Sequence, residues 1–274
     1  MTFVVTLSSR LSGSYNAACV GRGMALEADP SLKICVLDSE SASAGETRIV
    51  MLLRDLIDAN LSFEEIEQRV RAFIAPMRTR FVLEDLSHLV KNGRISKMAG
   101  FVGTVLNLRP LMADNGHGEI VCLEKIRGTA NAMKKLVEHV AAETADAARA
   151  SLVLVLSYCN CAPRALELQR DLLASCAALK DVIMVPTGGI STVYADDGGV
   201  AVHTGLLRHD AGGFLQQMED VVAGLRDHQN IPRPEIFSGL FLIPGDAEVA
   251  AGARACRAFA LHQNVAHQMH LQQV

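Results

Sequence analysis

The chain has 274 residues, 50% hydrophobic and 20% charged, which provides enough apolar material for one large core or two smaller ones. Its net charge of −4 and the absence of a basic block argue against a nucleic-acid-binding surface. The sequence contains no apolar run of about 18 residues that would predict a membrane span, and its start does not resemble a signal peptide.

The seven cysteines are scattered along the chain. Cys159-Asn160-Cys161 has neither zinc-site nor thioredoxin spacing, so we interpret most of the thiols as small buried side chains. Thiols in a chain that begins without a secretory signal favour a reducing compartment, and we expect the protein in the cytoplasm.

Strand and helix patterns alternate in the first part of the chain. Apolar runs at 3–7 and 33–37 predict buried strands, and helices are expected at 13–28 and 44–59. A capping box, Ser62 with Glu65, begins a third helix whose apolar side chains share one face: Phe63, Ile66, Val70, Phe73, Ile74 and Met77. This order predicts a largely parallel sheet, in which we also place a strand at 80–84.

The pattern then changes to a second, mixed α/β unit. A hairpin is expected at about 110–126, around the turn residues Asn115, Gly116, His117 and Gly118. A helix follows at 130–148, and the strands at 152–156 and 182–185 should join the hairpin in a second sheet. We therefore expect an α/β protein with a partial N-terminal domain at 1–80 and a second domain at 81–205.

Residues 206–274 differ in composition. There is no lysine after Lys180, and five of the nine histidines lie beyond Gly205. Helices are expected at 214–226 and 247–269, which gives a C-terminal helical extension of unknown role.

A serine-rich turn joins the first strand to the first helix. Four hydroxyl groups crowd it, and Gly13 would let a ligand approach the backbone; the four residues are Ser8, Ser9, Ser12 and Ser14. Ligands bind outside the carboxyl ends of parallel strands, and a helix N-terminus attracts anions, so this turn could hold a carboxylate or a phosphate. An N-cap serine with solvated neighbours explains the same residues.

These residues carry a family resemblance. The segment 7–15 is similar to the SS-x-L-S-G-T-Y signature of the DegV family, with Ser14 in place of threonine. The segment 91–96 resembles the family's GGRIS motif, with Asn92 in place of the first glycine. Three further segments, 107–110, 125–128 and 157–160, resemble family landmarks, and all five follow the family order and spacing over residues 3–203.

The resemblance implies a two-domain DegV-like fold, a parallel sheet with flanking helices plus a mixed α/β domain. It also implies a protein that is not an enzyme and needs no cofactor. A long-chain fatty acid would lie in the interdomain cleft and be presented to a separate fatty acid kinase subunit. Its carboxylate would be held by the serine-rich turn, Ser8, Ser9, Ser12, Gly13 and Ser14. Arg127 becomes a candidate for charge complementarity or kinase docking, or else a plain surface arginine.

The chain departs from the family in two ways that affect the site. The family's first strand and a Thr-Ser-Gln-Pro-like segment would precede Met1, so half of the carboxylate clamp is missing. The N-terminal sheet should then have an open edge unless residues 206–274 fill it. His203 resembles the histidine of the family's HTGPG turn and is a candidate ligand residue. A second alignment, which we prefer, places Ala195 near the ligand and His203 on a strand.

Other functions fit the sequence less well. A hydrolase would need a G-x-S-x-G elbow, and a nucleotide-binding protein a phosphate loop; neither motif is present. A metal site at His262, His267 and His270 has no carboxylate near it. The main alternative is a shortened DegV relative that binds nothing, or that acts only as a structural or protein-interaction module.

Overall fold

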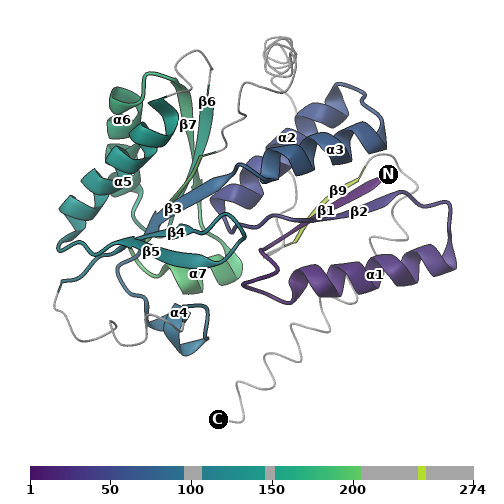
Figure 1. The fold of residues 1–274 in the computed structure, drawn as a ribbon, viewed down its shortest axis with the longest axis horizontal. Coiled ribbons are helices and arrows are strands. Elements are labelled where there is room, and N and C mark those ends of the chain that lie inside the picture. The colour runs from purple at the N-terminus through teal and green to yellow at the C-terminus, as the bar shows by residue number, and fades with distance from the viewer. Residues whose placement is uncertain (96–106, 146–151, 205–239, 245–274) are drawn as a thin grey trace.

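The computed structural model describes residues 1–95, 107–145, 152–204 and 240–244, which form two α/β units, each built on its own sheet (Figure 1). The expected helices at 214–226 and 247–269 lie outside these residues. The first sheet has three strands in the order β2-β1-β9. In it, β1 (Thr2–Thr6) pairs in parallel with β2 (Ile34–Asp38) and antiparallel with β9 (Leu240–Pro244).

Helices cover both faces of the first sheet. The connection from β1 to β2 is α1 (Ser14–Ala28), which packs on one face, and α2 (Ala44–Asp58) and α3 (Phe63–Ile74) pack on the other (Figure 1). The expected capping box starts α3: the Ser62 hydroxyl accepts the Glu65 N–H, and the Glu65 carboxylate accepts the Ser62 N–H. The apolar stripe of α3 is buried against α2 and the sheet, as its spacing predicted.

The second sheet has six strands in the order β5-β4-β3-β8-β6-β7. Their bounds are Arg78–Val82 for β3, Leu111–Asp114 for β4, Ile120–Glu124 for β5, Leu152–Tyr158 for β6, Leu179–Pro186 for β7 and Val200–Thr204 for β8. The expected hairpin is β4–β5, and Gly116 and Gly118 in its turn have positive φ angles. Only the β6–β7 pair is parallel among the described strands of this sheet.

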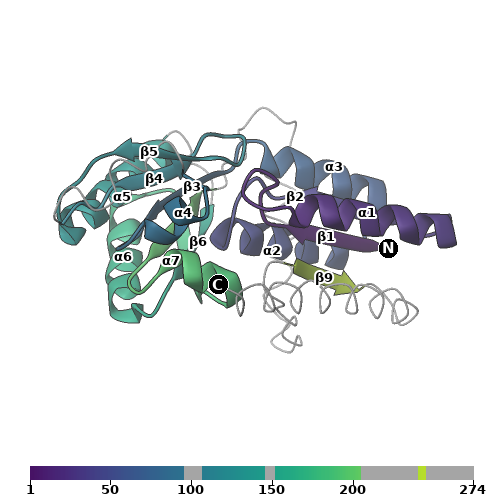
Figure 2. The ribbon, with the colours of Figure 1, turned by 90° about the horizontal axis from the view of Figure 1, so that it is seen from below.

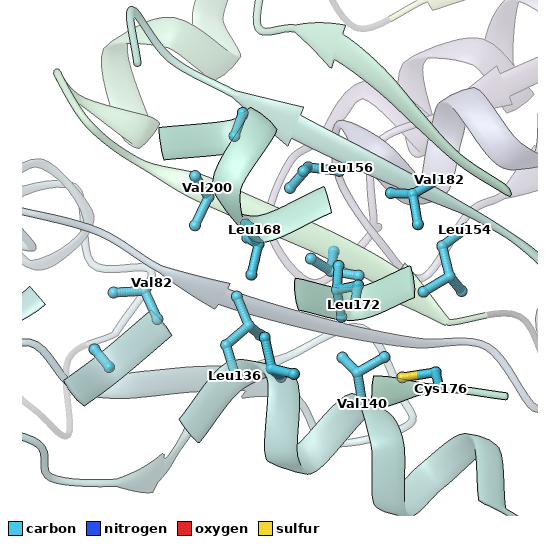
Figure 3. Packing of buried hydrophobic residues seen from close by; sticks show 14 of the residues in the cluster. Val82, Leu136, Val140, Leu154, Leu156, Leu168, Leu172, Cys176, Val182 and Val200 are labelled. Carbon is cyan, nitrogen blue, oxygen red and sulfur yellow. The ribbon is translucent and has the colours of Figure 1, made fainter. Parts of the chain in front are cut away.

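The two faces of the second sheet carry different cores. Two long helices, α5 (Thr129–Thr144) and α6 (Ala162–Ser175), bury Leu136, Val140 and Leu168 against Leu154 and Leu156 of β6 (Figure 3). The short helices α4 (Ser87–Lys91) and α7 (Gly189–Ala195) lie at the other face. They share a smaller core there, made of Leu83, Leu86, Leu89, Ile95 and Met112.

One strand assignment from the sequence is wrong. The strand near 80–84 is β3, which belongs to the second sheet, where it pairs antiparallel with β4 and β8. A short apolar run fits either sheet equally well, and the deciding partner, β8, lies more than a hundred residues further along the chain.

The edge of β1 is paired. The extension provides β9, whose Pro244 lies opposite Thr2 and whose Leu240 lies opposite Thr6. This is the outcome expected if residues 206–274 fill that edge. The strand itself was not predicted, although the apolar run Leu240-Phe241-Leu242-Ile243 before Pro244 is typical of one.

Candidate functional site

The serine-rich turn is anchored to the hairpin of the second unit through Ser8. This side chain is fully buried, and its hydroxyl donates a hydrogen bond to the Gly118 carbonyl oxygen at 2.8 Å. The Ser8 hydroxyl oxygen also accepts a hydrogen bond from the Arg10 N–H at 3.2 Å. Ser8 therefore joins the two units across the site, and its hydroxyl proton is already used.

The rest of the turn is more open. The Ser12 hydroxyl lies 2.8 Å from that of Ser14 and accepts the Ser14 N–H, while the Ser12 N–H donates to the Ser8 carbonyl. The N–H groups of Ser12 and Ser14 therefore already have acceptors within the protein. Among the described residues, no acceptor faces the N–H groups of Gly13 and Tyr15, and no side chain caps α1. Ser9 is exposed, and its N–H donates to the Asp38 carboxylate.

A polar cavity of about 330 Å³ opens beside this turn. Its walls are Ser9, Arg10, Leu11, Ser12, Gly13, Asn92, Gly93 and Arg94. The guanidinium of Arg94 donates to the carbonyls of Leu11 and Asn92, which fixes it between the turn and the end of α4. Two arginines and the N-terminus of α1 make this cavity electropositive.

An apolar pocket of about 140 Å³ lies between the two units. Its aliphatic and aromatic wall comes from both: Leu7, Leu11, Ala42, Phe81, Leu83, Leu89, Ile120, Ile190, Tyr194, Ala195, Val200 and Ala201. Several of these side chains belong to the small core shared by α4, α7 and the hairpin. The pocket meets the polar cavity at Leu11 and Arg94, which line both.

A second polar turn, which the sequence reasoning missed, borders the apolar pocket. It runs from the end of β2 to α2, and two of its residues, Glu40 and Ser43, have positive φ angles of 49° and 52°. Its Ser41 hydroxyl lies 2.7 Å from that of Thr79 in β3. The signal was available, because this turn also follows the carboxyl end of a parallel strand and precedes a helix.

His203 is buried behind this second turn. It lies opposite Thr79 in the pairing of β8 with β3, and a Cβ on Gly45 would be 3.5 Å from its Nδ1. Neither ring nitrogen has a partner among the described residues. Burial, and then the positive charge of Arg48, lower the pKa of His203 to about 3, so the ring is neutral. His203 lines neither cavity, whereas Ala195 lines the apolar pocket, as in the preferred alignment.

The family assignment comes from a model described as "Uncharacterised protein, DegV family COG1307", which matches residues 2–204. The chain belongs to the DegV family. A DegV domain-containing protein of Streptococcus pneumoniae is 35% identical to this DegV protein over 201 residues, which is 72% of this chain and 69% of the relative. A DegV domain-containing protein of Streptococcus pyogenes is 31% identical over 198 residues, 72% of this chain and 67% of the relative.

Solved DegV structures match the fold. A DegV protein of Ruminococcus gnavus, solved with vaccenic acid, has a TM-score of 0.68 at 41% identity, over 74% of this chain and 71% of that one. The Fatty Acid Kinase (Fak) B3 protein of Streptococcus pneumoniae, loaded with linoleic acid, has a TM-score of 0.66 at 34% identity, over 74% of this chain and 70% of that one. A DegV protein of Eubacterium eligens, loaded with heptadecanoic acid, has a TM-score of 0.66 at 28% identity, over 74% of this chain and 72% of that one.

Arg127 of this DegV protein lies apart from the other candidate residues. It is exposed in the segment between β5 and α5, and its carbonyl accepts a hydrogen bond from the Asn131 side chain. It lines neither cavity. The structure thus brings together Ser9, Ser12 and Gly13 at the polar cavity, with Ser14 next to them, and leaves Arg127 outside.

Two negative findings concern the described part of the chain. Its histidine, cysteine and acidic side chains form no group of three that could hold a metal ion. None of its helices combines the length and the apolar character needed to cross a membrane. The histidines at 262, 267 and 270 lie outside the described residues.

Proposed function

We propose that this DegV protein binds a long-chain fatty acid in the apolar pocket and presents its carboxylate to a separate fatty acid kinase subunit. The observation that carries the proposal is the contact between two cavities of opposite character at Leu11 and Arg94. An amphipathic ligand with one anionic end suits this arrangement. The fatty acids in the related DegV structures support the ligand class.

The acyl chain supplies most of the affinity in this proposal. Each buried CH₂ group gains about 0.8 kcal/mol, whereas a hydrogen bond to a charged group gains about 1.5–3 kcal/mol. The pocket of about 140 Å³ is smaller than the roughly 300–1,000 Å³ typical of ligand pockets. We therefore expect side chains in its wall to move apart when the chain enters.

The serine-rich turn would set the orientation of the ligand. Arg94 lies where the two cavities meet, and Gly13, whose N–H has no acceptor among the described residues, lines the polar cavity beside it. A carboxylate placed there would face the open polar cavity, from which a kinase could reach it. Arg127, exposed at a distance from the turn, is proposed as a docking residue for that kinase.

We propose a binding role and no catalytic role for this chain. The most buried hydroxyl of the turn, that of Ser8, is bonded to a carbonyl and an amide, and the histidine most deeply buried is neutral and lines neither cavity. All six described cysteines are free thiols, which supports the cytoplasm as the place of action.

A titration with a fatty acid and its neutral methyl ester tests the proposal. The wild-type protein should bind the acid more tightly than the ester, because only the acid offers a carboxylate to the turn. Mass spectrometry of organic extracts should also find a fatty acid that co-purifies with the protein. Equal binding of acid and ester would refute the carboxylate site, and no binding of either would favour the alternative of a DegV relative without a ligand.

A further inference from the structure

The side chains of the second sheet that line the apolar pocket differ in size. Strand pairing places four residues in one row across the sheet: Ser157 of β6, Ala201 of β8, Phe81 of β3 and Met112 of β4. Paired residues point to the same face, and alternate residues such as Leu156 point to the opposite face, toward α5 and α6 (Figure 3). Of the row, Phe81, Ala201 and Ser157 line the pocket. Because Ser157 and Ala201 are small, the pocket is deeper over β6 and β8 than over β3, and we call this part the β6–β8 depression.

Helices α7 and α2 border the β6–β8 depression. Tyr194 and Ala195 of α7 line the same pocket. In Figure 2, α4 and α7 lie on the side of the second unit that is nearer the first unit, and α5 and α6 lie on the far side. In the next row of the same face, Val155 and His203 are fully buried, and α2 packs against their strands. The depression is therefore limited by α2 on one side and by α7.

The depression lies some distance from the serine-rich turn. That turn is bonded through Ser8 to Gly118, between β4 and β5, and the strand order places β3 between β4 and β8. Neighbouring strands are about 4.8 Å apart, so β8 lies roughly 10 Å from β4, and β6 lies roughly 14 Å from it. A fatty acid whose carboxylate is at the serine-rich turn must pass Phe81 before its chain reaches the depression. Only the carbon atoms near its methyl end would lie there.

The sheet side of the depression is more rigid than the α7 side. Strand β8 is paired on one edge with β3 and on the other with β6, so its backbone is held at a fixed position. Helix α7 has seven residues, none of them buried, and glycines at both ends: Gly188 and Gly189, then Gly198 and Gly199. Gly189 and Gly198 have positive φ angles. A ligand can displace α7 more easily than β8, so the side chains on β8 and β6 limit the space.

We propose that Ser157 and Ala201 determine the length of acyl chain that the protein accepts, and that the methyl end of a long chain occupies the β6–β8 depression. This inference rests on the proposed function, binding of a fatty acid. Each further CH₂ group that enters the depression should raise the affinity about fourfold. A chain too short to pass Phe81 gains nothing from the depression, so the protein should select long chains.

Titration of Ala201→Val with a long and a short fatty acid tests the proposal. The variant adds two carbon atoms to the depression, so the affinity for hexadecanoic acid should fall about fifteenfold. The affinity for decanoic acid should change less than about twofold, because its chain ends before the depression. Ala130→Val, at an exposed position of α5, should change neither affinity. An equal change for both acids, or none for hexadecanoic acid, would overturn the proposal, whereas a wild-type protein that binds neither acid would refute the proposed function itself.

Photolabelling of the wild-type protein gives a second measurement that does not depend on the folding of a variant. Hexadecanoic acid with a diazirine at its methyl end should label peptides that contain residues 152–158, 189–195 or 200–204, identified by mass spectrometry. The same acid with the diazirine beside the carboxylate should label residues 7–15 or 118–120 instead. Labels from the methyl-end probe that are confined to other peptides would place the end of the chain elsewhere and overturn the proposal.

Discussion

Arg94 donates a hydrogen bond from Nε to the carbonyl oxygen of Leu11 at 2.9 Å, and these two residues separate the polar cavity from the apolar pocket. The bond spans 83 positions of sequence and connects the serine-rich turn of the first unit to the end of α4 in the second. A ligand that occupies both cavities would therefore contact the junction of the two units.

Replacement of Arg94 should affect the acid and the ester differently. In Arg94→Gln we expect the affinity for a fatty acid to fall about two- to fivefold, the range of an exposed charge interaction, while methyl ester binding stays the same. Isothermal titration with both ligands measures this. Arg170→Gln, an exposed arginine on α6, should change neither affinity.

A larger side chain at Ala195 should fill part of the apolar pocket. Ala195→Leu adds three carbon atoms, and displacement of about three CH₂ groups of the ligand would cost about 2.4 kcal/mol, or roughly fiftyfold in affinity. Ala130→Leu adds the same group at an exposed position of α5. Equal fatty acid affinity in the two variants would mean that the acyl chain lies elsewhere.

Gly118 should tolerate no side chain. Its φ is +77°, and a Cβ there would lie 2.2 Å from the Ser8 Oγ. Gly118→Ala should therefore strain the backbone and also break the contact between the two units. Gly93→Ala has a similar φ of +73° with open space around it and should cost only about 1–2 kcal/mol. Urea denaturation should show Gly118→Ala to be the less stable of the two by a further ~1–3 kcal/mol.

His203 should make the protein less stable in acid. Its pKa is about 3 in the folded protein against about 6.5 in the unfolded chain, so the unfolded state binds the proton between these values. Stability should fall as the pH drops below about 6.5, by up to ~1.4 kcal/mol per pH unit, relative to His203→Leu. Denaturation midpoints should be measured at pH 8, 6 and 5 in the wild type and in His203→Leu. If the midpoint changes with pH by the same amount in both proteins, the ring is not buried.

Glu46 should have the opposite effect over an overlapping range. Its carboxyl group is buried, and one of the two oxygens has no partner among the described residues. Burial raises the pKa of Glu46 to about 7, although the hydrogen bond from the Ser43 N–H acts to lower it. The folded state binds the proton between about pH 4.5 and 7, so stability should fall as the pH rises through that window. Glu46→Gln should remove this loss; an unchanged profile would contradict it.

Local sequence patterns predicted where helices, strands and turns occur better than which strands pair with one another. The capping box at Ser62 and the turn at Gly116 and Gly118 depend on residues a few positions apart, and both have the expected geometry. The partner of β3 depends on β8, and the partner of β1 on β9, which lie far along the chain. No periodicity in the sequence encodes such a pairing.

The candidate site shows the same division. The serine-rich turn follows a strand end, so its position at a cavity could be predicted from the order of elements. The hydrogen bond from Ser8 to Gly118 could not be predicted, because the hairpin is brought there only by the packing of the two units. The turn at Ser41 was missed although the same strand-end rule applies to it.

The pairing of β1 with β9 has a consequence for synthesis of the protein. Translation proceeds at about 5–20 residues per second, so β1 leaves the ribosome tens of seconds before its antiparallel neighbour exists. During that interval the edge of β1 is open to any other strand, and contacts so distant in sequence also form slowly. Chaperones that shield exposed strand edges should therefore act on this chain until its last residues have been made.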